Sequence, residues 1–313
     1  MDDVRITTLT VNPVVDLSVT VDRVEANRKL RCRDPEREPG GGGINVARVV
    51  CRLGARARAV FAAGGSAGEL LTRLLEAEGV PAEPVAVDGF TRENLMVAES
   101  GSDRQYRFLL PGAELTADEQ DRLIEAALAD DPDYVVTSGS LPPGVPANFY
   151  ARLARAAPPG TRVVLDTSGE ALSAGVESGV FLVKPNLREL GHLAGREVSE
   201  DPAPEEAARS LIEGGRAEYV VVSLGAGGAL LATTEGTERI AAPTVPIRSR
   251  VGAGDSTVAG MVVGLVQGDD IATAVRLGVA AGAAAVMSPG TGLCRREDVE
   301  RLFRRLRERA GET

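Results

Sequence analysis

Short apolar runs alternate along the chain with longer segments of helical spacing. Helical spacing occurs at Glu205–Ile212, Ile271–Met287 and Val299–Leu306, and at Leu123–Leu128 after a capping-box pattern of Thr116 and Glu119. Runs typical of buried parallel strands lie at Val4–Leu9, Arg58–Ala62, Asp133–Thr137, Val163–Leu165, Phe181–Val183 and Tyr219–Val222. Strands that alternate with helices predict a doubly wound α/β fold, in which helices flank a mostly parallel sheet.

Two segments break this alternation of strands and helices. Val14–Val21 reads V-V-D-L-S-V-T-V, and Leu95–Glu99 faces Gln105–Leu109 across the turn Gly101-Ser102-Asp103. Alternating apolar and polar residues are typical of antiparallel strands with one polar face. We therefore expect one domain over residues 1–313, with a small β-sheet inserted at about 13–35 and 93–111. Such a sheet can serve as a lid over a site.

Composition narrows the classes of function. The net charge is −10, aromatic residues make up 3% and Trp is absent, so the chain lacks the basic surface and stacking rings that nucleic-acid binding requires. Charged residues follow Met1 directly and interrupt the most apolar stretches, so neither a signal peptide nor a membrane span is expected. The odd, scattered cysteines favour a reducing, cytoplasmic location; they are Cys32, Cys51 and Cys294.

The most informative stretch runs from Val251 to Ser256, where a glycine-rich turn precedes the apolar segment Val258–Val266. Unpaired N–H groups at a helix N-terminus suit a phosphate or a phosphoryl group in transfer. A carboxylate repels phosphate, so we interpret Asp255 as a base that faces a substrate hydroxyl. The alternative is an ordinary helix cap.

A second glycine run, Gly40-Gly41-Gly42-Gly43, leads into a helix that begins near Asn45. Glycine loses the most backbone entropy on folding, so four in a row are expected where a ligand lies against the main chain and leaves no room for a Cβ. Asn45 can hydrogen-bond sugar hydroxyls through both ends of its amide. The alternative is a flexible linker, although a linker does not usually lead straight into an apolar helix.

Lysine is rare: of 35 basic residues only Lys29 and Lys184 are lysine, which indicates places that need a compact ammonium group. Lys184 ends a predicted strand, where parallel sheets bind ligands, and can meet a phosphate. Asn186 and Glu189 follow on one helix face and could hold a hydrated Mg²⁺, the alternative being that Glu189 is only a helix-start acid. A further strand ends at Ser223 in a glycine-rich turn suited to a nucleotide.

Two common nucleotide-binding motifs are absent. Neither glycine run has the dinucleotide-binding spacing, and no P-loop Gly-Lys-Ser or Gly-Lys-Thr occurs, so a dehydrogenase and a Walker-type ATPase are disfavoured.

Together these motifs resemble the ribokinase-like (PfkB) carbohydrate kinases in order and spacing. The glycine run ending in Ile44-Asn45, the Lys184-Pro185-Asn186 block with Glu189, and Gly252-Ala253-Gly254-Asp255 carry the resemblance over nearly the whole chain. Further segments are similar to members that act on fructose 6-phosphate; they are Lys29–Cys32, Gln105–Phe108, Ser138–Gly144 and Ser168–Leu172.

The resemblance implies phosphorylation of the C1 hydroxyl of fructose 6-phosphate by MgATP. It implies Asp255 as proton acceptor and the N–H groups of Gly252, Ala253 and Gly254 as the anion hole. It implies that the sugar is bound by Asp16, Gly41, Gly42, Asn45 and Ser138, and its 6-phosphate by Lys29, Arg31, Arg92 and Arg107. It implies that ATP contacts Lys184, Asn186, Ser223, Gly225, Gly228 and Arg250.

The resemblance also implies cations and a partner subunit. Glu189 would hold Mg²⁺ through water, Ser249 and Val251 are candidates for a K⁺ site, and lid strands of two subunits would clasp each other in a homodimer. Two positions depart from relatives: Arg250 replaces the usual Thr, and Gly42 stands where kinases of fructose 1-phosphate and tagatose 6-phosphate usually carry Lys. Those two acceptors, and a non-catalytic sugar-phosphate sensor, remain the alternatives.

Overall fold

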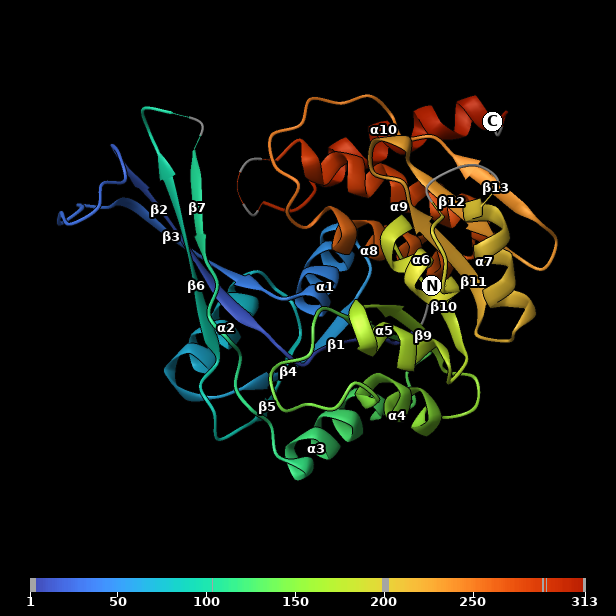
Figure 1. The fold of residues 1–313 in the computed structure, drawn as a ribbon, viewed down its shortest axis with the longest axis horizontal. Coiled ribbons are helices and arrows are strands. Elements are labelled where there is room, and N and C mark those ends of the chain that lie inside the picture. Colours follow the sequence, from blue (N-terminus) through green and yellow to red (C-terminus); the bar gives the residue numbers. More distant parts are fainter. Residues whose placement is uncertain (1–3, 103, 199–202, 289, 291, 312–313) are drawn as a thin grey trace.

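The computed structural model describes residues 4–102, 104–198, 203–288, 290 and 292–311, so Asp103 of the predicted turn lies outside the described residues. A nine-stranded sheet forms the middle layer (Figure 1). In spatial order its strands are β13 (Thr237–Ile240), β12 (Ala229–Ala232), β11 (Ala217–Ser223), β10 (Val180–Val183), β9 (Arg162–Asp166), β8 (Tyr134–Ser138), β1 (Ile6–Thr10), β4 (Ala57–Ala63) and β5 (Ala82–Ala86). The strands from β11 to β5 pair in parallel, whereas β12 and β13 are antiparallel. The predicted doubly wound fold is confirmed.

Helices cover both faces of the large sheet. One face packs against α1 (Gly42–Arg52), α2 (Gly65–Ala77), α8 (Ala253–Gln267), α9 (Ile271–Val286) and α10 (Arg296–Ala310). The other packs against α3 (Ala117–Leu128), α4 (Phe149–Ala156), α5 (Gly169–Val176), α6 (Leu187–Ala194) and α7 (Ala203–Glu213). Successive strand residues point to opposite faces, so the neighbours Val135 and Val136 belong to different core clusters. None of the described helices is long and apolar enough to cross a membrane.

The helix start at Thr116 forms as the sequence pattern predicts. Its side chain accepts a hydrogen bond from the Glu119 N–H, and the Glu119 carboxylate accepts one from the Thr116 N–H. This reciprocal cap satisfies two backbone donors that the first turn of α3 leaves without intrahelical partners.

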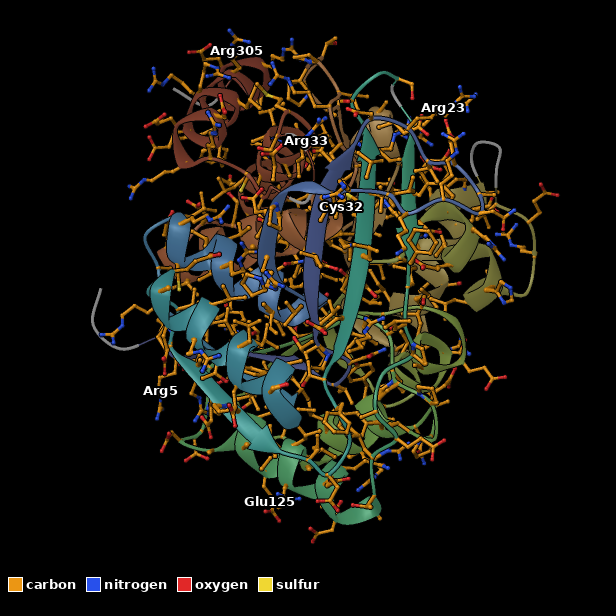
Figure 2. All side chains as sticks on the ribbon, turned by 90° about the vertical axis from the view of Figure 1, so that its left-hand side faces the viewer. Arg5, Arg23, Cys32, Arg33, Glu125 and Arg305 are labelled. Carbon is orange, nitrogen blue, oxygen red and sulfur yellow. The ribbon has the colours of Figure 1, made fainter. Side chains whose placement is uncertain are left out.

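A separate four-stranded sheet projects from one side of the α/β body, at the left of Figure 1. Its order is β3 (Arg33–Gly40), β2 (Val14–Val21), β6 (Arg92–Glu99) and β7 (Gln105–Phe108). Figure 2 shows it from that side, with Cys32 and Arg33 labelled where β3 begins. Small apolar contacts hold it together, and they centre on Val19, Val21 and Val97.

The expectation that β2 lies antiparallel to its neighbours is correct for β3 and wrong for β6. Residues Val14 to Val21 pair in parallel with Arg92 to Glu99. The connections explain this direction, because β2 follows β1 and β6 follows β5, and both therefore leave the same carboxyl edge of the large sheet. The predicted pairing of Leu95–Glu99 with the next strand is confirmed, with Leu95 opposite Phe108.

Strand β3 has no counterpart in the pattern analysis. Its sequence, RDPEREPG, is charged and contains two prolines, and most of it is exposed. It forms at the edge of the small sheet, where Leu17 pairs with Arg37 and Asp16 with Glu38. An edge position tolerates proline because one side of the strand needs no ladder hydrogen bonds.

Candidate active site

Polar side chains gather at the carboxyl edge of the large sheet. Strands β8 and β9 end at Ser138 and Asp166, β10 is followed at once by Lys184, and β11 ends at Ser223. The chain runs from β1 to β4 on one side and returns to β8 on the other, so the strand order reverses between β1 and β8. Ligands of open α/β sheets bind at such a reversal, on the carboxyl edge of the sheet at which the sequence predicts ligand binding.

Asp255 lies half-buried in the first turn of α8, behind the N-cap Gly252, whose φ is 72°. The Asn45 amide nitrogen of α1 donates to one carboxylate oxygen of Asp255 at 2.8 Å. The Ser138 hydroxyl lies 3.5 Å from the other oxygen. The structure therefore brings together three predicted residues from three elements, and α8 directs its unpaired N–H groups to the same place.

Lys184 is 7% exposed, and its ammonium lies 3.0 Å from a carboxylate oxygen of Asp166. A Cβ added at Gly254 would be 3.6 Å from the same ammonium nitrogen, so the cation faces the N-terminus of α8. Burial acts to lower the pKa of Lys184, but attraction by Asp166, with Asp255 and Glu189, raises the pKa above its usual value. The ammonium group is therefore charged at neutral pH.

Burial raises the pKa of Asp255 to about 6, and the negative charge of Asp166 adds to the rise. The hydrogen bonds from Asn45 and Ser138 and the charge of Lys184 oppose it. A carboxyl group with a pKa near the working pH is suited to accept a proton during a reaction.

The glycine run packs against the protein's own atoms. A Cβ at Gly42 would lie 2.6 Å from the Ser138 carbonyl carbon and 2.7 Å from the Gly139 nitrogen. A Cβ at Gly43 would lie 2.5 Å from the Leu9 carbonyl oxygen, and one at Gly40 would meet the Asp16 carboxylate. The expectation that a ligand excludes the Cβ atoms is therefore replaced here by close packing of α1 on β1 and β8 and of the end of β3 on β2. Gly41 additionally has a φ of 115°, which L side chains rarely adopt.

The predicted phosphate-binding cations separate into two groups. Burial raises the pKa of Asp16 above its usual value, and Arg92 and Arg107 lie close enough to oppose this rise. Arg92 donates to the backbone carbonyls of Asn12 and Pro13 at 3.1 and 3.4 Å. Lys29 and Arg31 are exposed in the loop between β2 and β3, and among the described contacts neither touches another predicted substrate residue.

On the opposite side, Asn186 and Glu189 form a reciprocal cap at the start of α6. The Asn186 side chain accepts from the Glu189 N–H, and the Glu189 carboxylate accepts from the Asn186 N–H, both at 2.9 Å. One Glu189 oxygen thus has a structural role, as the helix-start alternative holds. No group of three or more His, Cys, Asp or Glu within the described ranges is arranged to hold a metal.

The remaining predicted nucleotide residues lie beside this cap. Asn186 and Ser223 form a β-bridge, and the short helix η1 (Gly225–Gly227) follows Ser223. Gly228 has a φ of 96°, and a Cβ there would be 2.6 Å from the Ala242 nitrogen. Further along, Arg250 is exposed and stands between the half-buried residues Ser249 and Val251. The Ser249 hydroxyl accepts a hydrogen bond from the Val251 N–H at 3.2 Å.

Two charged residues, one in this site and one beside it, were not predicted. Asp166 ends β9 just as Lys184 follows β10, so the same strand-end argument would have found it. Arg48 is 2% exposed on α1, and its signal is a charged residue between apolar neighbours, Val46 and Ala47 on one side and Val49 and Val50 on the other.

A carboxylate at a helix N-terminus, a lysine facing it and further polar side chains at a sheet reversal form the arrangement expected of a carbohydrate kinase with a ribokinase-like fold. Ribokinase from Thermotoga maritima has this fold, with a TM-score of 0.77 at 20% identity over 96% of this chain and 100% of that chain. The model of the pfkB family carbohydrate kinases matches residues 9–298. The chain belongs to the pfkB family.

Its relatives are similar over nearly their full length. ATP-dependent 6-phosphofructokinase isozyme 2 of Mycobacterium tuberculosis is 48% identical over 96% of this chain and 89% of the relative. The Escherichia coli protein of the same name is 44% identical over 96% of this chain and 98% of the relative. Phosphofructokinase-2 from E. coli in complex with potassium has a TM-score of 0.93, 44% identity and a coverage of 97% of this chain and 99% of that chain. The complex of the E. coli protein with fructose 6-phosphate has a TM-score of 0.90 and 43% identity, and the match covers 97% of this chain and 99% of that chain.

Proposed function

We propose that the protein is an ATP-dependent 6-phosphofructokinase, which transfers the γ-phosphoryl group of ATP to the C1 hydroxyl of fructose 6-phosphate and yields fructose 1,6-bisphosphate. The observation that carries the proposal is Asp255 at the N-terminus of α8, held by Asn45 and Ser138 and faced by Lys184. The names of the relatives that are 48% and 44% identical support this activity, and the E. coli structure with fructose 6-phosphate supports the acceptor.

In this proposal Asp255 accepts the proton of the C1 hydroxyl and orients that oxygen toward the γ-phosphorus. The transition state of phosphoryl transfer is loose, so the proton leaves late and positioning contributes most. The N–H groups of Gly252, Ala253 and Gly254 would stabilise the negative charge of the transferring group, with Lys184 beside them.

The sugar would lie between Asp255 and the base of the small sheet, where it meets Asp16, Gly41, Gly42, Asn45 and Ser138. Its 6-phosphate would be held by Arg92 and Arg107 from this subunit. Lys29 and Arg31 lie in an exposed loop at a distance from these residues, which fits the idea that they reach the site of a second subunit. The small sheet would then act as a lid and as the surface of a homodimer.

Exposed apolar side chains next to the small sheet support this dimer. Phe108, Leu109 and Leu110 are 52%, 69% and 54% exposed, which is unusual for adjacent large apolar residues in an isolated subunit. Light scattering of the purified protein is expected to give twice the mass of the chain.

ATP would extend along Lys184, Asn186, Ser223, Gly225 and Gly228. Bound Mg²⁺ supplies charge neutralisation of the phosphates, and Glu189 would hold it through water. The backbone carbonyls of Ser249 and Val251 are the candidates for K⁺, a cation named with the similar E. coli structure.

Arg250→Thr is expected to raise the KM for ATP by about tenfold, because one charge-assisted hydrogen bond to a phosphate would be lost. Initial rates at varied ATP and K⁺ concentrations measure this. Arg248→Thr is the matched control, since Arg248 is also exposed and stands two positions earlier. An Arg250→Thr variant with unchanged ATP affinity and unchanged K⁺ response would remove Arg250 from the nucleotide site.

The pH dependence of kcat/KM is expected to show an acidic limb near pH 6. Asp255 accepts a proton only when it is ionised, and its pKa is raised to about 6, so activity falls as pH drops through that value. Initial rates between pH 5 and pH 9, as a rough range around this pKa, measure the limb. A limb at the ordinary aspartate pKa would contradict the assigned environment.

A coupled assay of ADP formation on three phosphosugars tests the function itself. Fructose 6-phosphate is expected to give the highest kcat/KM, with the new phosphate at C1 by NMR. Higher turnover of fructose 1-phosphate or tagatose 6-phosphate would assign the chain to those kinases instead. Sugar-phosphate binding without ATP consumption would indicate a sensor.

A further inference from the structure

Arg48 is a buried cation next to the candidate active site but not in contact with the place proposed for substrate. It is 2% exposed and lies on α1, one turn after Asn45. No other arginine of the described residues is buried to this degree. A buried charge is costly unless its partners are well placed, so its surroundings call for an explanation.

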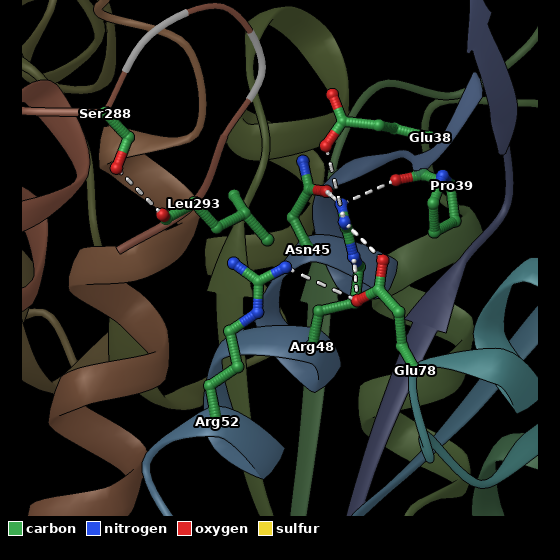
Figure 3. A network of polar contacts seen from close by, with 8 residues as sticks. All are labelled: Glu38, Pro39, Asn45, Arg48, Arg52, Glu78, Ser288 and Leu293. Atoms are coloured by element: carbon green, nitrogen blue, oxygen red, sulfur yellow. Dashed lines mark hydrogen bonds and ion pairs between the residues drawn. The ribbon is translucent and has the colours of Figure 1, made fainter. Parts of the chain in front are cut away.

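The Arg48 guanidinium donates four hydrogen bonds and forms a further ion pair with Glu38 (Figure 3). The two Glu78 carboxylate oxygens accept from Nε at 2.8 Å and from Nη2 at 2.6 Å. Nη2 is also 3.7 Å from a Glu38 oxygen. Nη1 donates to the Pro39 carbonyl at 2.8 Å and to the Asn45 side-chain oxygen at 3.5 Å. One planar group thus joins α1, the end of α2 and strand β3.

The contact with Asn45 determines which way its amide faces. A guanidinium only donates, so it selects the oxygen end of the amide and leaves the nitrogen end for Asp255. In the opposite orientation the amide oxygen would face the Asp255 carboxylate, and two acceptors would repel each other. Arg48 therefore acts on Asp255 through a single intervening side chain.

The contact with Pro39 attaches the root of the small sheet, meaning the end of β3 at Glu38 to Gly40, to α1. Pro39 immediately precedes the glycine run, and Glu38 lies directly opposite Asp16 in the ladder of β2 and β3. Side chains that face each other across antiparallel strands share one face of the sheet. Arg48 thus contacts both the end of β3, which carries Glu38 opposite Asp16, and the start of α1, which carries Asn45.

We propose that Arg48 is a positioning residue, which orients the Asn45 amide toward Asp255 and fixes the root of β3 to the core. The proposal rests on the proposed function only in taking Asp255 as the base. Lysine cannot replace Arg48, because an ammonium group has no planar fork and cannot reach Glu78, Pro39 and Asn45 together.

Arg48→Lys, made in the wild type and in an Asn45→Ala background, tests the route of action. In the wild type it is expected to lower kcat by about tenfold, because the base loses its orienting partner. In the Asn45→Ala background the further loss of kcat is expected to be less than about twofold, because the side chain through which Arg48 acts is already absent. An equal loss in both backgrounds would overturn the proposal.

The titration of the Asp255 carboxyl gives a readout independent of turnover. It can be followed by ¹³C NMR of labelled aspartate, with the signal assigned by its absence in Asp255→Asn. Asp166 and Lys184 are the charged groups that face Asp255, and they are left in place. Loss of the amide donor is expected to raise the Asp255 pKa by up to about one unit in Arg48→Lys. Arg48→Lys added to Asn45→Ala is expected to cause no further rise. An unmoved titration in Arg48→Lys would also overturn the proposal.

Arg52→Lys is the matched control, since Arg52 also contacts Glu78, at 3.4 Å, but touches neither Asn45 nor Pro39. It is expected to leave kcat and the titration unchanged. If Arg48→Lys does not fold, Glu78→Gln loosens the guanidinium and is expected to move both readouts in the same direction by a smaller amount; no movement would count against Arg48. An inactive wild type in which Arg48→Lys still shifts the titration would reject the proposed function and retain the role of Arg48.

Discussion

Asp255→Asn is expected to lower kcat by about 10²- to 10⁴-fold and to leave the KM for fructose 6-phosphate nearly unchanged. The amide keeps the size of the side chain; its oxygen can still accept from Asn45, and its nitrogen can donate to the Ser138 hydroxyl. It cannot take a proton from the substrate hydroxyl, so the loss falls on the chemical step. Steady-state rates at varied fructose 6-phosphate measure both constants, and full turnover by the variant would refute Asp255 as the base.

The same substitution is expected to stabilise the fold at neutral pH. The pKa of Asp255 is about 6 in the folded protein and 3.8 ordinarily, so the folded state binds more protons than the unfolded state between these values. The stability therefore falls as pH rises from about 4 to 6, and the full cost of ionising Asp255 is present above pH 6. Removing the charge is expected to raise Tm by about 2 °C or more at pH 8 and not at pH 4.

Asp118→Asn is the matched control for both measurements. Asp118 is also an acid in the first turn of a helix, α3, but its side chain is 85% exposed. The change is expected to alter neither kcat nor the pH dependence of Tm. A similar gain of stability in both variants would attribute the effect to general charge reduction in this acidic chain.

Lys184→Met is expected to lower the free energy of unfolding by about 3 kcal/mol or more at pH 8. The Lys184 ammonium and Asp166 form an ion pair whose side chains are 8% and 15% exposed. Removing the ammonium leaves Asp166 and Asp255 without a cation between them. Urea denaturation measures the loss. Protonation of Asp255 relieves its repulsion with Asp166, so the loss of unfolding free energy is expected to be smaller below about pH 5.

Adding Asp166→Asn to Lys184→Met is expected to restore much of the lost stability, since the uncompensated charge disappears. Lys29→Met serves as the stability control, because Lys29 is the only other lysine and is exposed; its effect should stay within about 0.5 kcal/mol. A double variant as unstable as Lys184→Met alone would show that the lysine stabilises the fold through packing rather than charge.

Six strands of the large sheet, β1, β4 and β8 to β11, could be predicted because burial on both faces makes them largely apolar, whereas β5, β12 and β13 towards its two edges were not predicted. The predicted run Asp133–Thr137 corresponds to β8, Tyr134–Ser138, and Tyr219–Val222 lies within β11. Strand β3 could not be predicted, since its charged residues form a strand only because β2 offers a free edge. The parallel pairing of β2 with β6 likewise depends on connections far apart in the sequence.

The candidate site was predictable as far as strand ends and helix starts determine it. Lys184 and Asp255 occupy such positions, and the structure brings them to one place. The partners that set their charge states come from distant segments: Asp166 lies on β9, and Arg48 reaches Asp255 only through Asn45. The glycine run was located correctly, but the atoms that exclude its Cβ positions belong to β1, β2 and β8, which only the folded structure reveals.

The charged strand β3 also decides how the small sheet can meet another molecule. An uncovered sheet edge is a template for uncontrolled strand addition and aggregation, and charges and prolines are the usual protection against it. Strand β3 carries five charged residues and two prolines among its eight residues, RDPEREPG. Growth of the sheet past this edge is therefore blocked, which leaves the faces of the small sheet and its other edge, β7, for the subunit contact of the proposed dimer.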